Sequence, residues 1–385
     1  MLSWRSKTIF FMLELRRALS FHVITRQRYP YLNFAHFDTE IRQKIYRNHK
    51  IIAKMNRSER QRPNNGSVLP PKRRRHTSGA ASMKNTIDDD AEIDIAGPMM
   101  ILSPAKTLDL SPLDAAALAS LPLSPTHPSC DSGRTAAVVE AVVKAGKSKG
   151  WKKVLGVSDS LASVAAQYWK DFSADVALAP ASSTKPALFA FDGPAYRAVS
   201  ASSCSSDALA YLQINLRIID PVHGALRPLD AIQPYRLEMA TRDLNMDGAT
   251  GKGGLAKYWA PAVTRALAEV LKKRPEEQRV VLNLASDEYS AAVDPDSLPV
   301  GTRFVKAVFQ QEGKVIAVHA KAARGMMVRY VGEQKVMDVE QVKSFDLEGY
   351  GFVEDRSTED CFVFDRKKPK PKPKKKAGAA VKKTK

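Results

Sequence analysis

Cysteine is scarce in this chain: only Cys130, Cys204 and Cys361 occur among 385 residues, far apart and without a CxxC pair or a His/Cys metal spacing. Few scattered cysteines argue against a disulfide framework or a zinc ribbon and are typical of a reducing compartment. Long apolar runs are also lacking, since none approaches the roughly 18 residues that a membrane-spanning helix needs. The sequence therefore predicts neither a secreted disulfide scaffold nor an integral membrane protein.

Acidic side chains are sparse at both ends of the chain, and these ends account for the net charge of +19. Residues 1–98 carry +10, residues 366–385 carry +11 without a single acid, and the stretch between them carries −2. A folded core without net positive charge can bind nucleic acid only through local patches.

Residues 1–97 have the composition of a basic extension and linker, and we expect them to be disordered. The run Lys72, Arg73, Arg74 and Arg75 follows two prolines and suits a nuclear-import signal. Three alternatives stay open: a solvated charge run, a mitochondrial or plastid transit peptide in the arginine-rich first 60 residues, and an upstream extension of the gene model before Met83.

Residues 366–385 form a second basic tail, in which lysine alternates with proline over residues 367–376. Proline prevents helix formation and keeps the charges extended, so we expect disorder here too. Such a tail binds polyanions without sequence preference, and its affinity falls steeply with salt.

Between residues 98 and 365 the sequence alternates short apolar runs, typical of buried strands, with segments of helical periodicity. The predicted strands are residues 99–103, 188–191, 216–219, 280–285, 304–309 and 315–319. Helices are predicted over residues 259–271, with Pro261 in the first turn, and over residues 320–330. Glu312 and Gly313 predict a hairpin turn. We therefore expect one α+β, or mixed α/β, domain over residues 98–365 with a mixed sheet.

Longer motifs in this core resemble a known family. They are Ser-Pro-Ala-Lys-Thr-Leu at 103–108, Leu-Arg-Pro-Leu-Asp at 226–230, Gln-Pro-Tyr-Arg-Leu-Glu-Met at 233–239, Asn-Leu-Ala-Ser-Asp-Glu-Tyr at 283–289, Ala-Lys-Ala-Ala-Arg-Gly at 320–325 and Glu-Gly-Tyr at 348–350. In this order they resemble the bacterial YaaA peroxide-stress proteins, over about residues 99–365. The resemblance implies a cytosolic protein that protects against hydrogen peroxide by limiting free iron, a compact mixed fold with a helix-hairpin-helix element, and DNA binding. It implies no settled reaction and does not extend to either tail.

The motifs place charged side chains where strands are predicted to end. Asp287 and Glu288 follow the run 280–285, and ligands collect at the carboxyl ends of strands in open sheets. Lys321 and Arg324 are three residues apart on one predicted helix and so share a face. The predicted charged cleft comprises Lys106, Arg227, Arg236, Glu238, Asp287, Glu288, Lys321 and Arg324.

Two interpretations of this set stay open. Acids beside several bases can transfer protons, bind a metal or hold a phosphodiester, and arginine suits forked pairing with phosphate. The same residues can instead form a structural salt-bridge network, Lys106 with Asp287 or Glu288 and Arg236 with Glu238. No glycine-rich phosphate loop and no metal or haem ligand set accompanies them, so no cofactor is predicted and no catalytic residue is assigned.

A helix-hairpin-helix candidate lies at about residues 133–172. Gly156 stands between two apolar residues, and Ser158 is a favourable N-cap for a helix with an apolar stripe. Hairpin amides and a helix N-terminus can bind a DNA phosphate without reading sequence. The predicted DNA contacts are Lys152, Lys153, Gly156 and Ser158. The alternative is a pair of packed core helices, and the acidic Asp159 departs from family members that carry a basic residue there.

Together these features predict a protein of the oxidative-stress response whose core binds double-stranded DNA or another phosphodiester, in the cytosol or the nucleus. Two alternatives stay open. The first is an enzyme that acts on a small phosphorylated or carboxylated substrate in the charged cleft, and the second is an iron-handling scaffold without direct DNA contact. A binding role is favoured over catalysis, and no oligomeric state is predicted.

Overall fold

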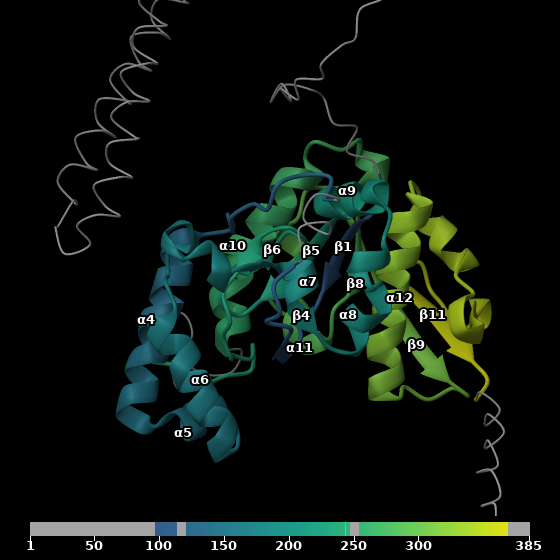
Figure 1. Ribbon diagram of the computed structural model, residues 1–385. Helices are drawn as coiled ribbons and strands as arrows, with labels where there is room; N and C mark the ends of the chain where they lie inside the picture. Colours follow the sequence, from purple (N-terminus) through teal and green to yellow (C-terminus); the bar gives the residue numbers. More distant parts are fainter. Residues whose placement is uncertain (1–96, 114–120, 243, 247–253, 369–385) are drawn as a thin grey trace, which may run out of the picture. The chain divides into compact units, whose positions relative to one another are not determined.

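The computed structural model describes residues 97–113, 121–242, 244–246 and 254–368, whose arrangement Figure 1 shows. All of them belong to one unit of the chain, residues 88–385. The predictions for residues 1–96 and 369–385, including the basic run at residues 72–75, lie outside the described residues. The disorder predicted from residue 366 is wrong at Arg366, which is the last residue of a strand. No helix of the described ranges is long and apolar enough to cross a membrane.

A seven-stranded mixed sheet forms the centre of the fold, in the order β10-β11-β9-β8-β1-β5-β6. Its strands are β1 (Met99–Leu102), β5 (Leu216–Asp220), β6 (Gly224–Leu226), β8 (Val280–Leu284), β9 (Arg303–Gln311), β10 (Tyr350–Phe352) and β11 (Cys361–Arg366). The five central strands run parallel, whereas β6 and β10 pair antiparallel at the two edges. The predicted mixed α/β fold is confirmed.

The burial pattern of each strand reflects whether one or both of its faces are covered. Every residue of β1, β5 and β8 is buried, which suits strands covered on both faces. β9 pairs with β8 on the side away from β1, and its burial alternates along most of its length, as expected for a strand with one covered face.

Helices and short strands surround this sheet. The α-helices are α4 (Ser132–Lys149), α5 (Trp151–Leu155), α6 (Asp159–Asp171), α7 (Ala187–Ala190), α8 (Pro194–Val199), α9 (Ser206–Asn215), α10 (Gly254–Leu271), α11 (Asp287–Ser290) and α12 (Ala317–Gln334). Two-residue strands pair as β2 (Thr107–Leu108) with β4 (Phe191–Asp192) and as β3 (Lys185–Pro186) with β7 (Ala231–Ile232). Short 3-10 helices occupy Val176–Leu178, Ala181–Ser183, Ala201–Ser203, Glu276–Gln278, Pro295–Ser297, Val339–Ser344, Leu347–Gly349 and Glu354–Arg356.

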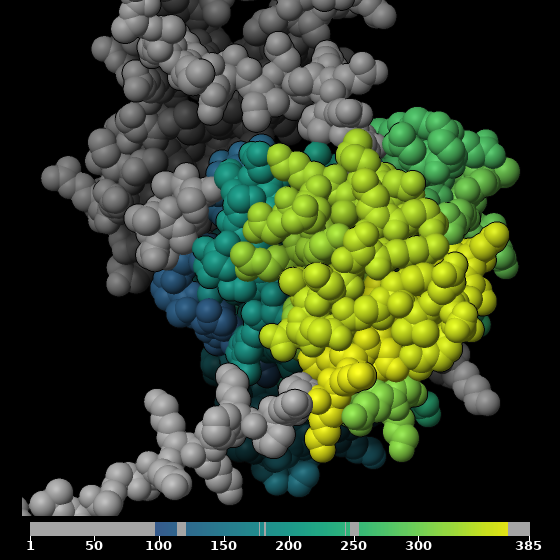
Figure 2. Space-filling model, turned by 90° about the vertical axis from the view of Figure 1, so that its right-hand side faces the viewer, coloured from purple at the N-terminus to yellow at the C-terminus, as the bar shows by residue number. Residues whose placement is uncertain are grey.

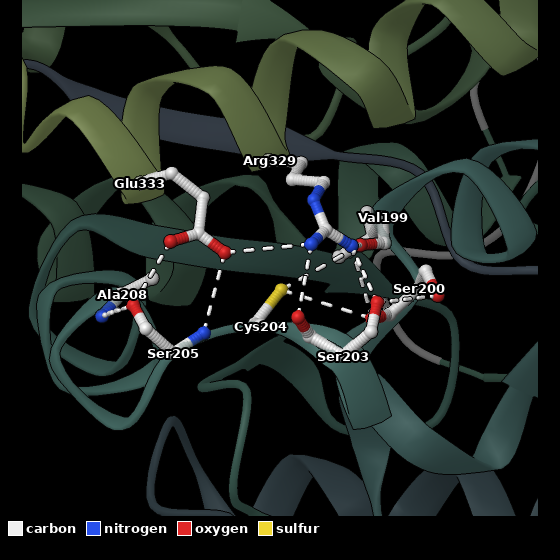
Figure 3. A network of polar contacts seen from close by, with 8 residues as sticks. All are labelled: Val199, Ser200, Ser203, Cys204, Ser205, Ala208, Arg329 and Glu333. Atoms are coloured by element: carbon white, nitrogen blue, oxygen red, sulfur yellow. Dashed lines mark hydrogen bonds and ion pairs between the residues drawn. The ribbon is translucent and has the colours of Figure 1, made fainter.

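α12 packs against α8, α9 and β9. Arg329 of α12 donates to the carbonyl oxygens of Val199 (3.1 Å) and Ser203 (2.9 Å), as Figure 3 shows. One turn later, Glu333 accepts a hydrogen bond from the Ser205 hydroxyl at 2.9 Å. These contacts fasten α12 to the segment between α8 and α9. Seen from the side (Figure 2), the C-terminal elements from α12 to β11, yellow-green to yellow, form one face beside the teal residues.

Four predicted strands are confirmed, but the predictions for residues 188–191 and 315–319 are wrong. The first run is mostly α7, in which the amide of Leu188 bonds to the Pro228 carbonyl (2.9 Å), and only its last residue, Phe191, pairs in a strand. The second run enters α12, and its Val315 and Val318 are 59% and 54% exposed. Periodicity cannot separate strand from helix in such short apolar runs.

The predicted turn and both predicted helices are present in the structure. Glu312 and Gly313 do form a tight turn, closed by the bridge between Gln311 and Lys314, but no second strand follows it. Both predicted helices exist and are longer than expected. Since α10 begins at Gly254, Pro261 lies inside the helix rather than in its first turn.

Candidate charged site at the carboxyl edge of the sheet

Three neighbouring parallel strands end at one edge of the sheet. β1 lies between β5 and β8, so that Met100 pairs with Leu216 on one side and with Leu282 on the other. Along the sequence, β5 adds on one side of β1 and β8 later adds on the other side. Ligands collect at such a switch point in open α/β sheets. The polar residues at these three carboxyl ends are Ser103, Asp220 and Ser286.

Hydroxyl groups connect these strand ends. The Ser286 amide donates to the Ser103 hydroxyl (3.0 Å), and the two serine hydroxyls lie 3.3 Å apart. Tyr196 of α8 donates its hydroxyl to the Ser103 carbonyl at 2.9 Å. The floor of the site is therefore polar and held by the sheet and by α8.

Asp220 is the most deeply buried carboxylate of this region, with no exposed surface. It accepts hydrogen bonds from the amides of Val222 (2.9 Å) and His223 (2.8 Å) and from the Tyr235 hydroxyl. Burial raises the pKa of Asp220 to about 6, although these hydrogen bonds act in the opposite direction. Asp220 can therefore exchange a proton near neutral pH.

Charged residues around this site, here called the charged rim, form two ion-pair groups. The first group contains Lys106, Arg236 and Glu238. Lys106 Nζ lies 2.6 Å from Glu238 Oε2, and Arg236 Nη2 lies 3.2 Å from the other carboxylate oxygen. Arg236 also donates to the Lys106 carbonyl at 2.8 Å. The predicted pairing of Arg236 with Glu238 is present, whereas Lys106 pairs with Glu238 and not with Asp287 or Glu288.

A second rim group surrounds Asp287. Lys306 of β9 donates to Asp287 at 2.7 Å, and this hydrogen bond lowers the pKa of the Asp287 carboxyl, assisted by the nearby charge of Arg324. Arg324 is largely buried, which lowers its pKa, and its Nε has no hydrogen-bond partner among the described residues. Glu288 accepts from the Ala240 amide at 3.0 Å, which ties this group to the segment that carries Glu238.

Two predicted members of the cleft lie apart from these contacts. Arg227 pairs with the buried Asp230 (2.9 Å). Since β6 runs back along β5 from Gly224 to Leu226, Arg227 lies toward the amino end of β5, away from Asp220. Lys321 is exposed on α12, one turn before Arg324, and has no ion-pair partner among the residues that the structure describes.

The helices α4, α5 and α6 form a helical arm, residues 132–171, at the left of Figure 1. Gly156 ends α5 in the left-handed conformation (φ 61°), and the Ser158 hydroxyl caps α6 by accepting from the Leu161 amide. Lys152 pairs with Asp159 at 2.8 Å, whereas Lys153 is exposed and unpaired within the described ranges. Two helices joined by a tight glycine turn are thus present, which does not by itself define a nucleic-acid-binding element.

The helical arm contacts the site directly. The Trp169 indole of α6 donates to the Arg236 carbonyl at 3.1 Å, and its ring lies 6.2 Å from that of Tyr235. In Figure 1, α5 and α6 lie in the lower half of the view, as does α11, which carries Asp287 and Glu288. The hydrogen bond of Trp169 therefore joins the last turns of the helical arm to the segment that carries Arg236 and Glu238.

Sequence reasoning missed several residues of this site. Asp220 ends a correctly predicted strand, so the rule that selected Asp287 would also have selected Asp220. Lys306 is the single polar residue of the predicted strand at residues 304–309. Tyr196 had no sequence signal, because its role depends on how α8 packs. Within the described ranges, no group of three or more His, Cys, Asp or Glu side chains could hold a metal ion.

The fold and the site together define an α/β protein with a charged site at the carboxyl edge of a mixed sheet. The family described as peroxide stress protein YaaA matches residues 99–356, and the chain belongs to this family. It is similar to UPF0246 proteins from Aliivibrio fischeri (strain MJ11) and Ralstonia nicotianae, each 36% identical over 274 residues. These matches cover 70% of this chain and 98% and 99% of the two relatives. A UPF0246 protein from Burkholderia thailandensis is 42% identical over 218 residues, which are 56% of this chain and 80% of the relative.

The family match confirms the predicted resemblance and supports a role in oxidative stress.

Proposed function

We propose that this chain is a peroxide-stress protein whose core binds double-stranded DNA along the charged rim and the helical arm, and that it limits iron-driven peroxide damage. The family match supports the peroxide-stress part of the proposal. The DNA-binding part depends on the charges of the rim and the helical arm.

Exposed cations without a carboxylate partner support DNA binding most directly. Lys321 on α12, Arg242 beyond Ala240 and Lys153 at the glycine turn are all exposed and unpaired among the described residues. A cation that is already paired with an acid gains little from a phosphate. An unpaired exposed cation that meets a phosphate releases a counterion from DNA and contributes its full effect to affinity.

Titration of a fluorescent duplex with the chain trimmed to residues 88–368 tests this proposal, because the trimmed chain keeps every described element and lacks the lysine-rich tail. Lys153→Gln and Lys321→Gln each remove one unpaired cation. We expect each to weaken binding and to reduce the slope of log affinity against log salt by about 1.

The matched control is Lys272→Gln, an exposed lysine that follows α10 and precedes the amino end of β8. This variant should bind like the unmodified chain. If the trimmed chain does not bind at low salt while the full chain does, the tails carry the affinity and the proposal for the core is wrong.

Asp220 favours a second candidate, an enzyme that acts on a small phosphorylated or carboxylated substrate. A buried carboxyl with a pKa of about 6 beside tyrosine hydroxyls can serve as a general acid or base. Loss of peroxide protection in Asp220→Asn with unchanged DNA affinity and no loss of stability would favour this enzyme. If variants that no longer bind DNA still protect, an iron-handling scaffold becomes the better explanation.

For the compartment, we propose cytosol or nucleus, on the basis of the basic run at residues 72–75 and the lysine-rich C-terminus. Imaging the tagged full chain beside a variant with alanine at all four positions tests this. Nuclear signal should fall in the variant, and an identical mitochondrial or plastid signal in both would contradict the proposal.

A further inference from the structure

A second cluster of arginines lies at the end of β5 opposite to the charged site. Arg217 of β5, Arg227 beyond β6 and Arg265 of α10 line one cavity of about 190 Å³. The cavity is also lined by Ser129, Cys130, Ala225, Ala266, Glu269 and Val270. No feature of the proposed DNA-binding surface uses this cavity.

Arg217 is 9% exposed and has no carboxylate partner among the described residues. Its Nη1 donates to the carbonyl oxygens of Gln213 (3.3 Å), Ile214 (3.1 Å) and Leu216 (2.8 Å), at the end of α9. These bonds hold the guanidinium in place, but carbonyl oxygens carry no net charge. A buried cation without a counter-ion is costly, and an anion in the cavity would offset that cost.

The residues that line the cavity include more bases than acids, although acids outside the lining pair with two of the arginines. Arg227 is paired with Asp230, which is fully buried behind it. Arg265 lies 3.3 Å from Asp131, a carboxylate that it shares with Arg134. Among the lining residues, Glu269 alone is acidic, against three arginines. Burial raises the pKa of the Cys130 thiol to about 11, so this side chain adds no negative charge.

We propose that this cavity binds a phosphate group, either inorganic phosphate or the phosphate of a small monoester. Guanidinium groups present paired donors whose geometry matches phosphate oxygens, and the buried Arg217 has no carboxylate partner among the described residues. The Ser129 hydroxyl offers a further donor on the wall. Since a water occupies about 30 Å³ in the liquid, the cavity has room for a phosphate with a small substituent but not for a segment of duplex.

Calorimetric titration of the full chain with inorganic phosphate and with glycerol phosphate tests the proposal and distinguishes the two sources. Equal ionic strength of chloride serves as the reference, because the lysine-rich tail attracts any anion. We expect saturable binding that Arg265→Gln weakens about tenfold or more, which corresponds to the loss of one charge-assisted contact. Arg265 is more than half exposed, so this variant should fold normally. Arg227→Gln should act in the same direction.

The matched control is Arg356→Gln, which removes a similarly exposed arginine that pairs with Asp365 at 2.6 Å on β11. It should leave phosphate affinity unchanged. Wild-type affinity in Arg265→Gln, or equal weakening in Arg356→Gln, would overturn the proposal. If Arg265→Gln instead lowers duplex affinity as much as Lys153→Gln does, the cavity belongs to a DNA-binding surface and the small-phosphate proposal is wrong.

Discussion

His223 and Asp220 are close neighbours at the end of β5, and burial shifts the pKa values of the two side chains in opposite directions. Neither ring nitrogen of His223 has a hydrogen-bond partner among the described residues, and the ring packs near Phe172 and Tyr235. Burial lowers the pKa of His223 to about 3 and raises that of Asp220 to about 6. In both cases burial disfavours the charged form.

His223→Phe should abolish the loss of stability in acid that His223 causes. Between pH 6.5 and 3 the unfolded chain protonates this histidine and the folded chain does not, so stability falls as pH falls, by about 2 kcal/mol at pH 5. Asp220 has the opposite effect between pH 4 and 6: the folded chain keeps a proton that the unfolded chain releases, so stability falls as pH rises.

Urea unfolding at several pH values between 4 and 7 separates the two contributions. In His223→Phe the free energy of unfolding should decrease as pH rises, because His223 then no longer opposes the contribution of Asp220. In Asp220→Asn it should increase over the same range. Profiles parallel to that of the unmodified chain would contradict these pKa shifts.

At the scale of elements, α12 approaches α8 closely at Gly325. A Cβ atom built on Gly325 would overlap the carbonyl group of Ala195, which belongs to α8. Because the obstacle is backbone, the helices can accommodate a side chain only by moving apart. Glycine is therefore required at this crossing even though α12 is an otherwise regular helix.

We expect Gly325→Ala to lower the free energy of unfolding by about 3 kcal/mol, the upper range for overpacking. The control is Gly133→Ala in the first turns of α4, where the nearest atom would lie at an ordinary 3.5 Å. Alanine is the better helix former, so the control should leave stability unchanged or raise it by up to about 1 kcal/mol. Equal effects of the two substitutions in urea unfolding would refute the close approach of α12 and α8.

The elements differ in how far the sequence predicts them. β1, β5 and β8 are largely apolar runs because both of their faces are covered, and this pattern was sufficient to predict them as strands. The run at residues 188–191 is equally apolar, but its amides bond to the segment at residues 228–230, a tertiary contact that no local pattern encodes. β6, with only three residues, had no recognisable pattern. Because β6 was not predicted, the sequence analysis grouped Arg227 with the residues at the carboxyl ends of the strands. In the structure, β6 returns the chain toward the amino end of β5.

For the molecule as a whole, the site combines segments that lie far apart in the sequence, around residues 106, 238, 287 and 324. The rule that ligand-binding groups follow strands identified Asp287 and Glu288 from the sequence. The pairing of Asp287 with Lys306 could not be predicted, because it depends on β9 lying beside β8. The Asp287 side chain is 83% exposed, so its ion pair is not the buried structural pair that the sequence left open.

Asp287→Asn and Lys321→Ala should therefore impair peroxide protection more than folding. An exposed ion pair contributes about 0.2–1 kcal/mol, so the thermal midpoint should hardly change. The control is Asp207→Asn, whose carboxylate is 73% exposed and pairs with Lys335 at 2.6 Å. Complementation of a peroxide-sensitive strain should fail for the first two variants and succeed for the control. A fall in the thermal midpoint large enough to account for the lost protection would show that these residues have a structural role only.

The central place of β1 has a consequence for the synthesis of the chain on the ribosome. β1 leaves the ribosome first among the strands of the sheet, yet Met100 pairs with residues that follow about 115 and 180 positions later. At about 5–20 residues per second, its apolar residues wait on the order of ten seconds for their first partner strand. Folding of the sheet is thus delayed until late in translation, and we expect nascent chains that end before β5 to depend on chaperones that shield β1.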